Sequence, residues 1–247
     1  MYAVIGGTGL NNLPGIEETE LKRADTRYGK PSGVLQVGKL NAVEICFLAR
    51  HGQPHSIPPH KINYRANIAA LKDAGVSAII AINAVGGIHY QLGPSHLSIP
   101  DQVLDYTSNR DHTIYDGSDD VLDHIDFTEP YTQSLRKTLI ACAKQAGKKV
   151  LPCGTYAATN GPRLESAAEV MKIKQDGGDM IGMTGMPEAA LAREMGLDYA
   201  CIAVSVNWGA GLHSLEPISM AAIETAMEKG MASVDAILAE FFARLDQ

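Results

Sequence analysis

The sequence predicts an α/β fold built on an open sheet, and three observations point that way. Short apolar runs alternate with amphipathic stretches along the chain. The 247 residues, 45% of them hydrophobic, suit one large α/β domain or two small ones. Several apolar runs end in a polar residue or a glycine-rich turn, which is where open α/β sheets place their ligand-binding loops.

The first half of the chain contains three candidate strands and one candidate helix. The strands are residues 2–5, 42–49 ("AVEICFLA") and 76–85 ("VSAIIAINAV"), and the third is apolar enough to be buried on both faces. Residues 64–75 have helical spacing and end at a glycine. Residues 100–130 are polar and rich in turn formers, so we expect a long loop that serves function or an interface.

The second half adds three candidate helices and two strands. Residues 165–178 read as a helix with a glycine stop, and 179–183 as a short strand. Residues 187–196 form a helix with proline in its first turn, followed by a buried strand at 199–206. A long amphipathic helix begins near Ser219, and its methionines are interpreted as core residues.

Bulk properties exclude several classes of partner. A net charge of −7 argues against nucleic acid or an anionic membrane surface. The four cysteines form no Cys-x-x-Cys pair, and Cys46 and Cys201 lie in apolar runs, as reduced core residues do. The chain shows no signal peptide and no apolar run long enough to span a membrane. We therefore expect a soluble cytoplasmic protein.

The opening stretch "MYAVIGGTGL" places a glycine-rich turn with one hydroxyl, Thr8, directly after the first strand. A dinucleotide motif would need a third glycine and a helix, and "NNLPGIEE" is a poor helix start. A loop whose free amides and Thr8 hydroxyl face a small anion fits better. A tight turn that only needs glycine dihedrals stays open.

Four other strands end in loops with polar residues. These loops begin "ARHGQPHSIPPH", "NAVGGIH", "MTGMPE" and "NWGAG". With Thr8 they supply a guanidinium (Arg50), an imidazole, hydroxyls and amides, a set that suits an oxyanion such as phosphate. Taken singly, Arg50 could be a surface ion pair and Thr184 a helix N-cap.

The "RHG" motif has two further interpretations. Histidine phosphatases carry Arg-His-Gly after a strand, although there it follows the first strand of the domain. His51, His55 and His60 could suggest a metal, but no carboxylate lies among them and the intervening prolines exclude a helix that would align them. We therefore expect no metal.

A series of motifs resembles a known family over nearly the whole chain. The motifs "GGTGL", "ARHG", "INYRANIAALKDAG", "NAVGGI", "YDGS", "GPRLE", "GMTGMPE" and "SVN" stand in the order found in the trimeric purine nucleoside phosphorylases and methylthioadenosine phosphorylases. That family converts a nucleoside and phosphate to a free base and ribose 1-phosphate without a metal or organic cofactor. The resemblance implies one phosphorylase domain over residues 1–247, with three layers around a mixed central sheet, and a homotrimer with active sites at subunit interfaces.

The resemblance also implies a site, position by position. The phosphate-binding residues would be Thr8, Arg50, His51, Asn83, Ala84 and Thr184. Met183 would lie against the ribose, and Met220 and Ile223 would face the 5′ substituent. The turn at 161–165 and Asn207 would meet the purine. His124, in the long loop, matches a position that reaches into a neighbouring subunit's site.

Three departures from the family pattern concern the base. Enzymes for 6-aminopurines carry aspartates where this chain has Asn207 and Gly209, and they lack the acid found here as Glu165. A carboxylate at Glu165 suits the N1–H donor of a 6-oxopurine, and Asn207 can serve O6 or N7. The alternative for Glu165 is an exposed residue at a helix start, favoured by the helix dipole.

At the 5′ end, Met220 stands where related nucleoside phosphorylases have a histidine. Together with Ile223 it suits a methylthio group better than a hydroxyl, unless His213 turns inward. The expected reaction is therefore phosphorolysis of 5′-methylthioinosine to hypoxanthine and 5-methylthioribose 1-phosphate, as in purine salvage. The catalytic residues would be Asn207, which stabilises the leaving base, Glu165, which orients it, and His51, as phosphate donor or loop-structuring residue. Phosphorolysis of inosine, guanosine or methylthioadenosine, histidine phosphatase activity and non-catalytic nucleoside binding stay as alternatives.

Overall fold

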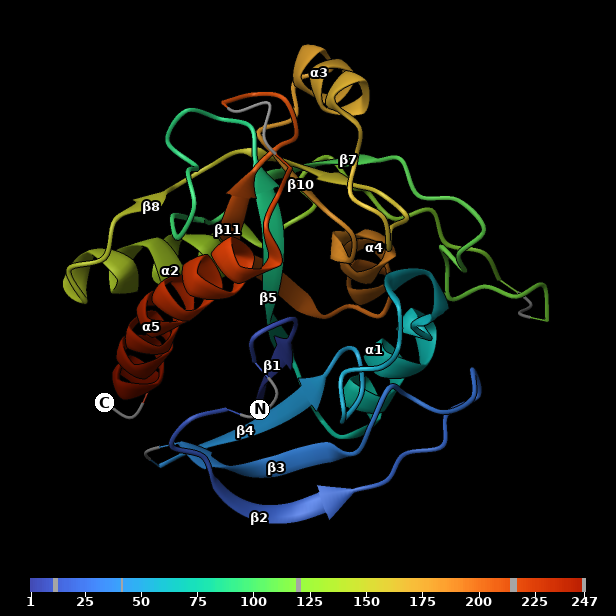
Figure 1. The fold of residues 1–247 in the computed structure, drawn as a ribbon. Coiled ribbons are helices and arrows are strands. Elements are labelled where there is room, and N and C mark those ends of the chain that lie inside the picture. The colour runs from blue at the N-terminus through green and yellow to red at the C-terminus, as the bar shows by residue number, and fades with distance from the viewer. Residues whose placement is uncertain (11–12, 41, 119–120, 214–216, 246–247) are drawn as a thin grey trace.

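The computed structural model describes residues 1–10, 13–40, 42–118, 121–213 and 217–245. In these residues, one 11-stranded sheet is flanked by five α-helices (Figure 1). The strands are β1 (Tyr2–Gly6), β2 (Glu17–Lys22), β3 (Leu35–Leu40), β4 (Val43–Ala49), β5 (Ala78–Gly87), β6 (Leu97–Ser98), β7 (Gln102–Asp105), β8 (Val150–Leu151), β9 (Thr155–Ala158), β10 (Met180–Gly182) and β11 (Asp198–Trp208). The helices are α1 (Tyr64–Asp73), α2 (Gln133–Gln145), α3 (Ala167–Gln175), α4 (Gly185–Glu194), α5 (Met220–Leu245) and a 3-10 turn, η1 (Pro59–Lys61).

The sheet is mixed and branches at β5. Its main path runs β2-β3-β4-β1-β5-β10-β9-β7, and β11 also pairs with β5 along its whole length. Strands β1, β4, β5 and β11 are mutually parallel, whereas β10 pairs antiparallel with the last residues of β5. The carboxyl ends of the four parallel strands therefore meet at one edge, where ligands of open α/β sheets bind.

Helices cover both faces of the central strands. Alternate strand residues such as Val4 and Ile80 pack with α2 and α5, and their neighbours Ala3 and Ile79 pack with α1 and α4. Figure 1 shows this separation, with α2 and α5 on one side of β5 and α1 and α4 on the other. Burial on both faces explains why the central strands are continuous apolar runs rather than alternating ones. The predicted three-layer α/β fold with a mixed sheet is confirmed.

The local sequence explains where the helices begin. Asn63 caps α1 by accepting a hydrogen bond from the amide of Ala66 at 3.0 Å. Ser166 and Glu169 form a reciprocal capping box at the start of α3. The spacing of apolar residues predicted both helices, and the caps fix their first residues.

The predicted strands and helices are all present, with ends shifted by a few residues. The expectation of an uninterrupted loop over 100–130 is wrong, because Gln102–Asp105 forms β7 beside β9. The sequence analysis did not identify β2, β3, β6, β8, β9 or α2. Strand β2 is an edge strand of mostly charged residues, so it lacks an apolar run.

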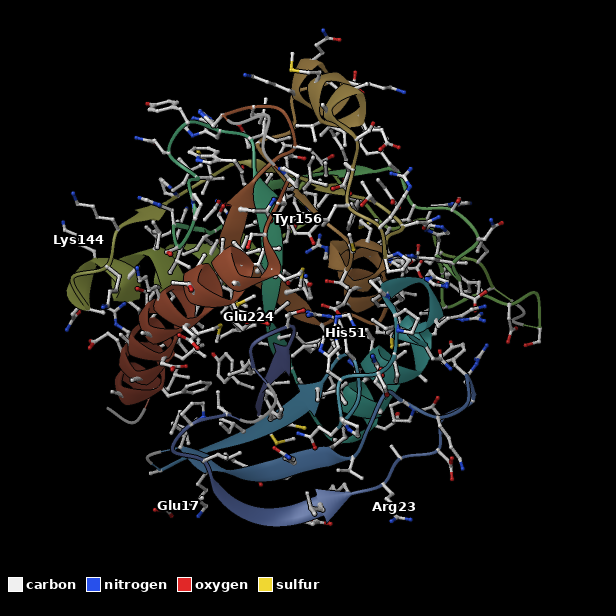
Figure 2. All side chains as sticks on the ribbon, in the orientation of Figure 1. Glu17, Arg23, His51, Lys144, Tyr156 and Glu224 are labelled. Atoms are coloured by element: carbon white, nitrogen blue, oxygen red, sulfur yellow. The ribbon has the colours of Figure 1, made fainter. Side chains whose placement is uncertain are left out.

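The cysteines are buried free thiols, as the sequence suggests, with the exception of Cys153. Cys46, Cys142 and Cys201 are buried free thiols, but Cys153 is exposed. Figure 2 shows His51 near the centre of the molecule and Lys144 at its edge. No helix of the described residues is long and apolar enough to cross a membrane.

Candidate active site

A cavity of about 180 Å³ lies at the carboxyl ends of the central strands. Most of the residues expected from the sequence line it: Thr8, Arg50, His51, Ala84, Glu165, Met183, Thr184, Asn207 and Ile223. They come from segments far apart in the chain, which the parallel strands bring to one edge. Asn83, Met220 and His124 are not among the lining residues.

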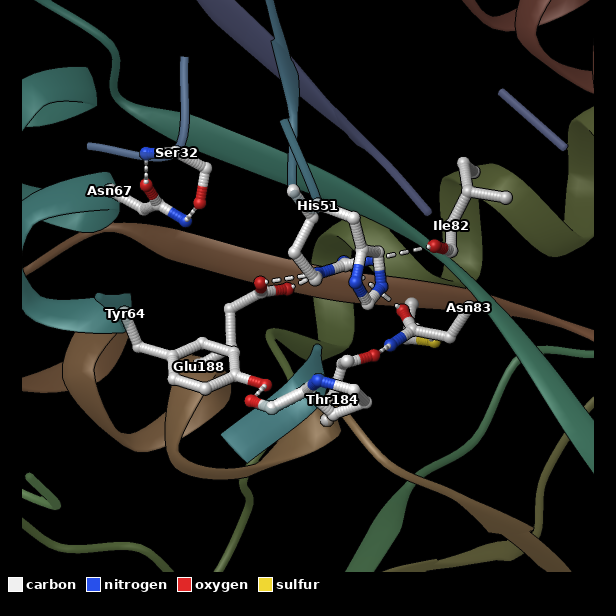
Figure 3. Close-up of polar contacts among 12 residues, drawn as sticks. Ser32, His51, Tyr64, Asn67, Ile82, Asn83, Thr184 and Glu188 are labelled. Carbon is white, nitrogen blue, oxygen red and sulfur yellow. Dashed lines mark hydrogen bonds and ion pairs between the residues drawn. The ribbon is translucent and has the colours of Figure 1, made fainter. Parts of the chain in front are cut away.

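Arg50 is fully buried and forms a two-pronged ion pair with Glu188 of α4. Its Nε donates to Glu188 Oε2 at 2.6 Å and its Nη2 to Oε1 at 2.7 Å, as Figure 3 shows around Glu188. The hydroxyl of Tyr199 also donates to Glu188 Oε1. Burial alone would lower the pKa of Arg50, but the Glu188 carboxylate raises it overall, so the guanidinium is permanently charged. The suggestion of a surface ion pair for Arg50 is therefore wrong in its location, because the pair is buried.

The glycine turn after β1 lies directly against this guanidinium. Arg50 Nη1 donates to the carbonyl of Ile82 at 2.9 Å, which leaves its second hydrogen for a ligand. A Cβ at Gly7 would stand 2.6 Å from the Ile82 oxygen and 2.9 Å from Nη1, so only glycine fits there. No helix follows β1 in the described part of residues 7–16, and the dinucleotide alternative is wrong.

Asn83 lies behind the cavity wall rather than in it. Its Nδ2 donates to Thr184 Oγ1 at 2.7 Å, and its Oδ1 lies 3.5 Å from Arg50 Nη2. Because Thr184 Oγ1 accepts from Asn83, its own hydrogen is free to point into the cavity. Asn83 thus orients Thr184, and its expected phosphate contact stays a prediction. Thr184 occupies the N-cap position of α4 but makes no capping bond with its side chain.

His51 is held in one orientation by its own loop. Its Nδ1 lies 2.8 Å from the carbonyl oxygen of Ile57, which can only accept, so Nδ1 carries a hydrogen. Burial, together with the nearby Arg50 and His55, lowers the pKa of His51 to about 4 against the opposing effect of the Ile57 bond. The ring is neutral at pH 7 and its Nε2 is an acceptor. Of the two roles expected for His51, the bond to Ile57 corresponds to the loop-structuring one, and the role toward phosphate stays a prediction.

Glu165 and Asn207, which the sequence analysis expects to meet the base, both line the cavity. Thr159 Oγ1 donates to Glu165 Oε1 at 2.6 Å, so Glu165 Oε2 is left for a ligand. Ser166 and Glu169 cap α3, and Glu165 is therefore not needed at the helix start. Asn207 Nδ2 donates to the carbonyl of Trp208 at 2.7 Å, which leaves its second hydrogen and its Oδ1 unused by that bond.

The remaining wall is apolar. Ile218, Ile223, Met227 and Met183 all contribute to it, and Met227 also lies against Gly9 of the turn after β1. Met220 is 65% exposed and does not line the cavity, so the structure does not bring it together with the other expected residues. Met227, expected only as a core residue, is both buried in the core and part of the cavity wall.

Two histidines lie away from the cavity. His213 is exposed and stacks on Trp208 with ring centroids 3.9 Å apart, so it does not turn inward. His124 is exposed in the loop before α2. Within the described ranges, no three His, Cys, Asp or Glu side chains gather where they could hold a metal ion.

Sequence reasoning missed the groups that hold the lining residues in place. Glu188 stands in the first turn of α4, where an acidic residue is ordinarily explained by the helix dipole. Thr159 ends β9, a strand that the analysis did not identify. The sequence around Glu188 and Thr159 does not indicate these roles. Only the fold shows that Glu188 pairs with Arg50 and that Thr159 donates to Glu165.

An oxyanion pocket beside a cavity with polar and apolar walls defines an α/β enzyme that brings an anion to an organic substrate. The model of the phosphorylase superfamily matches residues 1–243. The chain therefore belongs to the phosphorylase superfamily and is an enzyme of the phosphorylase type. The histidine-phosphatase alternative is wrong.

Proteins similar to this chain carry three different phosphorylase names. The chain is 51% identical to a "Probable S-methyl-5'-thioinosine phosphorylase" of Pseudomonas syringae pv. tomato, over 97% of each chain. It is 43% identical to the 6-oxopurine nucleoside phosphorylase of Pyrococcus furiosus, over 96% of this chain and 90% of that one. A solved structure of methylthioadenosine phosphorylase from Schistosoma mansoni with adenine has a TM-score of 0.93 and 31% identity, over 99% of this chain and 91% of the other.

Proposed function

We propose that this protein is an S-methyl-5′-thioinosine phosphorylase, which converts that nucleoside and phosphate to hypoxanthine and 5-methylthioribose 1-phosphate. The observation that carries the proposal is the 51% identity over 97% of both chains to a relative of that name. The cavity supports it with an oxyanion pocket at one end, a carboxylate on the base side and an apolar wall.

In the proposed mechanism, different cavity residues contact the phosphate and the departing base. Phosphate accepts hydrogen bonds from Arg50 Nη1 and the Thr184 hydroxyl, and Thr8 stands at the rim of the same pocket. The bond from C1′ to the purine nitrogen breaks with its electron pair going to the base, and a phosphate oxygen forms the new bond to C1′. Asn207 stabilises the departing base at N7, and fixed dipoles of this kind supply much of the rate enhancement of enzymes.

The base assignment rests on Glu165. A 6-oxopurine presents an N1–H donor, which the free Oε2 of Glu165 can accept. Adenine presents a lone pair at N1, and the carboxylate would repel it. The solved relative that binds adenine therefore informs the fold here but not the choice of base.

The 5′ assignment rests on Ile218, Ile223 and Met227. These side chains suit a methylthio group, since a hydroxyl buried among them would lose its hydrogen bond to water at a cost of about 1–3 kcal/mol. Inosine is the second candidate substrate, because the Pyrococcus furiosus relative is named a 6-oxopurine nucleoside phosphorylase. The apolar end of the cavity favours the methylthio compound.

The proposal extends to the whole protein. Residues 1–247 act as one nucleoside phosphorylase domain, and phosphate is the only other reactant, as co-substrate rather than cofactor. The chain forms a homotrimer in which His124 completes a neighbouring subunit's site. It works in the cytoplasm, which the three buried free thiols support, and it has no nucleic-acid or membrane partner.

A substrate panel with and without phosphate tests the proposal. Base release from methylthioinosine should require phosphate or arsenate and persist in chelators. Equal release without phosphate would make the protein a hydrolase. Faster turnover of inosine would overturn the 5′ assignment alone, and no turnover of any purine nucleoside would reject the enzyme assignment.

A further inference from the structure

Arg110 is a buried cation that no carboxylate of the described residues pairs with. It belongs to the long loop between β7 and α2. Its Nη1 donates to the carbonyls of Met186 at 2.6 Å and Met183 at 2.9 Å. Its Nη2 donates to the carbonyls of Asn160 at 3.0 Å and Thr159 at 3.3 Å. A buried charge without a counter-ion is costly, so its retention calls for a reason.

The acceptors of Arg110 lie on the two segments that meet the nucleoside. Met183 is itself a cavity residue, at the end of β10. Thr159 is the residue whose hydroxyl holds Glu165, at the end of β9. One guanidinium therefore bridges the segment assigned to the sugar and the segment assigned to the base.

A third contact extends the bridge to the rim of the cavity. Arg110 Nη1 also lies 3.3 Å from the hydroxyl of Tyr64, and its guanidinium carbon stands 5.4 Å from the centre of that ring. The Tyr64 hydroxyl donates to the carbonyl of Pro59, which lines the cavity. None of these contacts reaches Thr8, Arg50 or Thr184.

We infer that Arg110 is a positioning residue for the nucleoside half of the site, and that it sets the spacing between Met183 and Glu165 without touching the substrate. The inference rests on the proposed function. A displacement of about 1 Å between reacting groups can reduce turnover by about 10²-fold, so such a bridge has a measurable consequence. Lysine cannot replace it, because its ammonium is a compact point charge and cannot span two pairs of carbonyls.

Arg136 offers a matched control elsewhere in the fold. It is also buried, in α2, and also donates to backbone carbonyls, those of Pro100, Ile99 and Pro152. None of its partners lines the cavity. Removal of either buried arginine should therefore lower stability. Only the Arg110 variants should also have a raised nucleoside KM.

The experiment compares Arg110→Lys, Arg110→Ala and Arg136→Ala with wild type. The KM values for nucleoside and for inorganic phosphate are measured separately, with the purine nucleoside that wild type cleaves best. We expect Arg110→Lys to raise the nucleoside KM by about tenfold or more. The phosphate KM should rise by less, because Thr184, between Met183 and Met186, is the one phosphate-site residue next to its contacts. The variant's preference for a 6-oxopurine over a 6-aminopurine should fall as well, because Glu165 is no longer held in register.

Two further results complete the test. Millimolar guanidinium ion should lower the raised nucleoside KM of Arg110→Ala, and methylammonium should not. Arg136→Ala should lose thermal stability and keep both KM values. A nucleoside KM unchanged in Arg110→Lys, or equal rises in both KM values for Arg110 and Arg136 variants, would overturn the inference. If Arg110→Ala does not fold, Arg110→Lys decides. Failure of the proposed substrate would show in wild type itself, before any variant is compared.

Discussion

Glu188 determines how Arg50 can act. The carboxylate uses both of its oxygens on the guanidinium and accepts a further bond from Tyr199, all away from solvent. Arg50 is thereby fixed with one Nη1 hydrogen left toward the turn at Gly7 and Thr8. The proposed phosphate contact of Arg50 therefore depends on Glu188, which does not itself line the cavity.

Glu188→Gln should show this dependence. The neutral amide leaves a buried guanidinium without its counter-ion, which costs about 3–5 kcal/mol of unfolding free energy. The loosened Arg50 should also raise the phosphate KM by about tenfold or more, at a charged hydrogen bond worth about 1.5–3 kcal/mol. Urea unfolding and phosphate titration measure the two effects.

Glu169→Gln is the matched control for that variant. Glu169 also pairs with an arginine through both oxygens, but the side chains of Arg163 and Glu169 are exposed, so solvent screens the pair and its loss should change stability little. Glutamine can also complete the capping box of α3. Equal losses of stability in the two variants would contradict the importance assigned to the buried pair.

His51 should make stability depend on pH between its two pKa values. Burial lowers its pKa to about 4 in the native state, against 6.5 for an ordinary histidine. Between these values the unfolded chain binds more protons, so the stabilising contribution is complete above pH 6.5 and is lost as pH falls toward 4. The full difference amounts to about 3 kcal/mol.

The measurement is urea unfolding at pH 4.5 and pH 7 for wild type and His51→Asn. Wild type should lose about 2 kcal/mol more than the variant on acidification, since His55 and the other histidines contribute to both proteins. Parallel losses would show that the ring of His51 is charged or open to water in the native state.

Glu165 should determine the choice of base. Methylthioinosine should exceed methylthioadenosine in kcat/KM by at least about 10², because the carboxylate accepts from N1–H of one base and repels the N1 lone pair of the other. Glu165→Gln should reduce that ratio by about tenfold, since its amide can donate to adenine N1. Asn207→Asp should shift it further. An unchanged ratio in Glu165→Gln would remove this residue from base recognition.

At the scale of elements, α5 contributes side chains both to the core and to the apolar part of the cavity wall. Ile223, Met227, Gly230 and Val234 recur at intervals of three or four and so share one face of the helix. Ile223 and Met227 line the cavity, and Gly230 lies against β11 so closely that a Cβ there would overlap Cγ1 of Val204. The approach of α5 to the sheet thus sets the position of the cavity wall.

Gly230→Ala should test that dependence. Alanine gains about 1 kcal/mol of helix propensity, but the overlap with Val204 costs about 1–3 kcal/mol, so we expect a net loss of stability. The nucleoside KM should rise as Ile223 and Met227 move. Lys229→Ala, at the exposed neighbouring position, should change neither quantity. A higher Tm in Gly230→Ala would show that α5 can move away from β11 without cost.

The elements also show why some of the structure was predictable. Strands β1, β4, β5 and β11 are buried on both faces, so their residues are apolar throughout and visible in the sequence. Strand β2 pairs at the edge and its letters, "EETELK", carry no such signal. Helix α2 did have a periodic signal in Leu135, Leu139 and Cys142, which the sequence analysis did not use.

At the scale of the whole molecule, the residues that line the cavity could be predicted better than the residues that hold them in place. Many of the lining residues lie at or just after the ends of strands, so motif and position both indicate them. Glu188 and Arg110 act through partners 138 and about 50–75 positions away, and only the folded chain brings these together. Met220 was placed by resemblance alone, without regard to which face of α5 it occupies, and in the structure its side chain is exposed.

The long polar loop before α2 exposes two large apolar side chains. Val121 is 76% exposed and Leu122 is 60% exposed, and His124 follows them. These side chains lie outside the cavity of their own chain. In the proposed homotrimer they would contact a neighbouring subunit, and His124 would serve that subunit's site.

Subunit complementation tests this arrangement. His124→Ala damages only the site of the neighbour, whereas Asn207→Ala damages only the site of its own chain, since Asn207 lines that cavity. A site is intact when its own chain carries Asn207 and its neighbour carries His124. In a randomly mixed trimer, an equal mixture of the two variants should therefore have about one quarter of the wild-type sites. Activity that rises to this level after dissociation and reassembly, in a particle of three 26.4 kDa chains, supports the shared site. Activity that stays at the mean of the two separate variants would confine each site to a single chain.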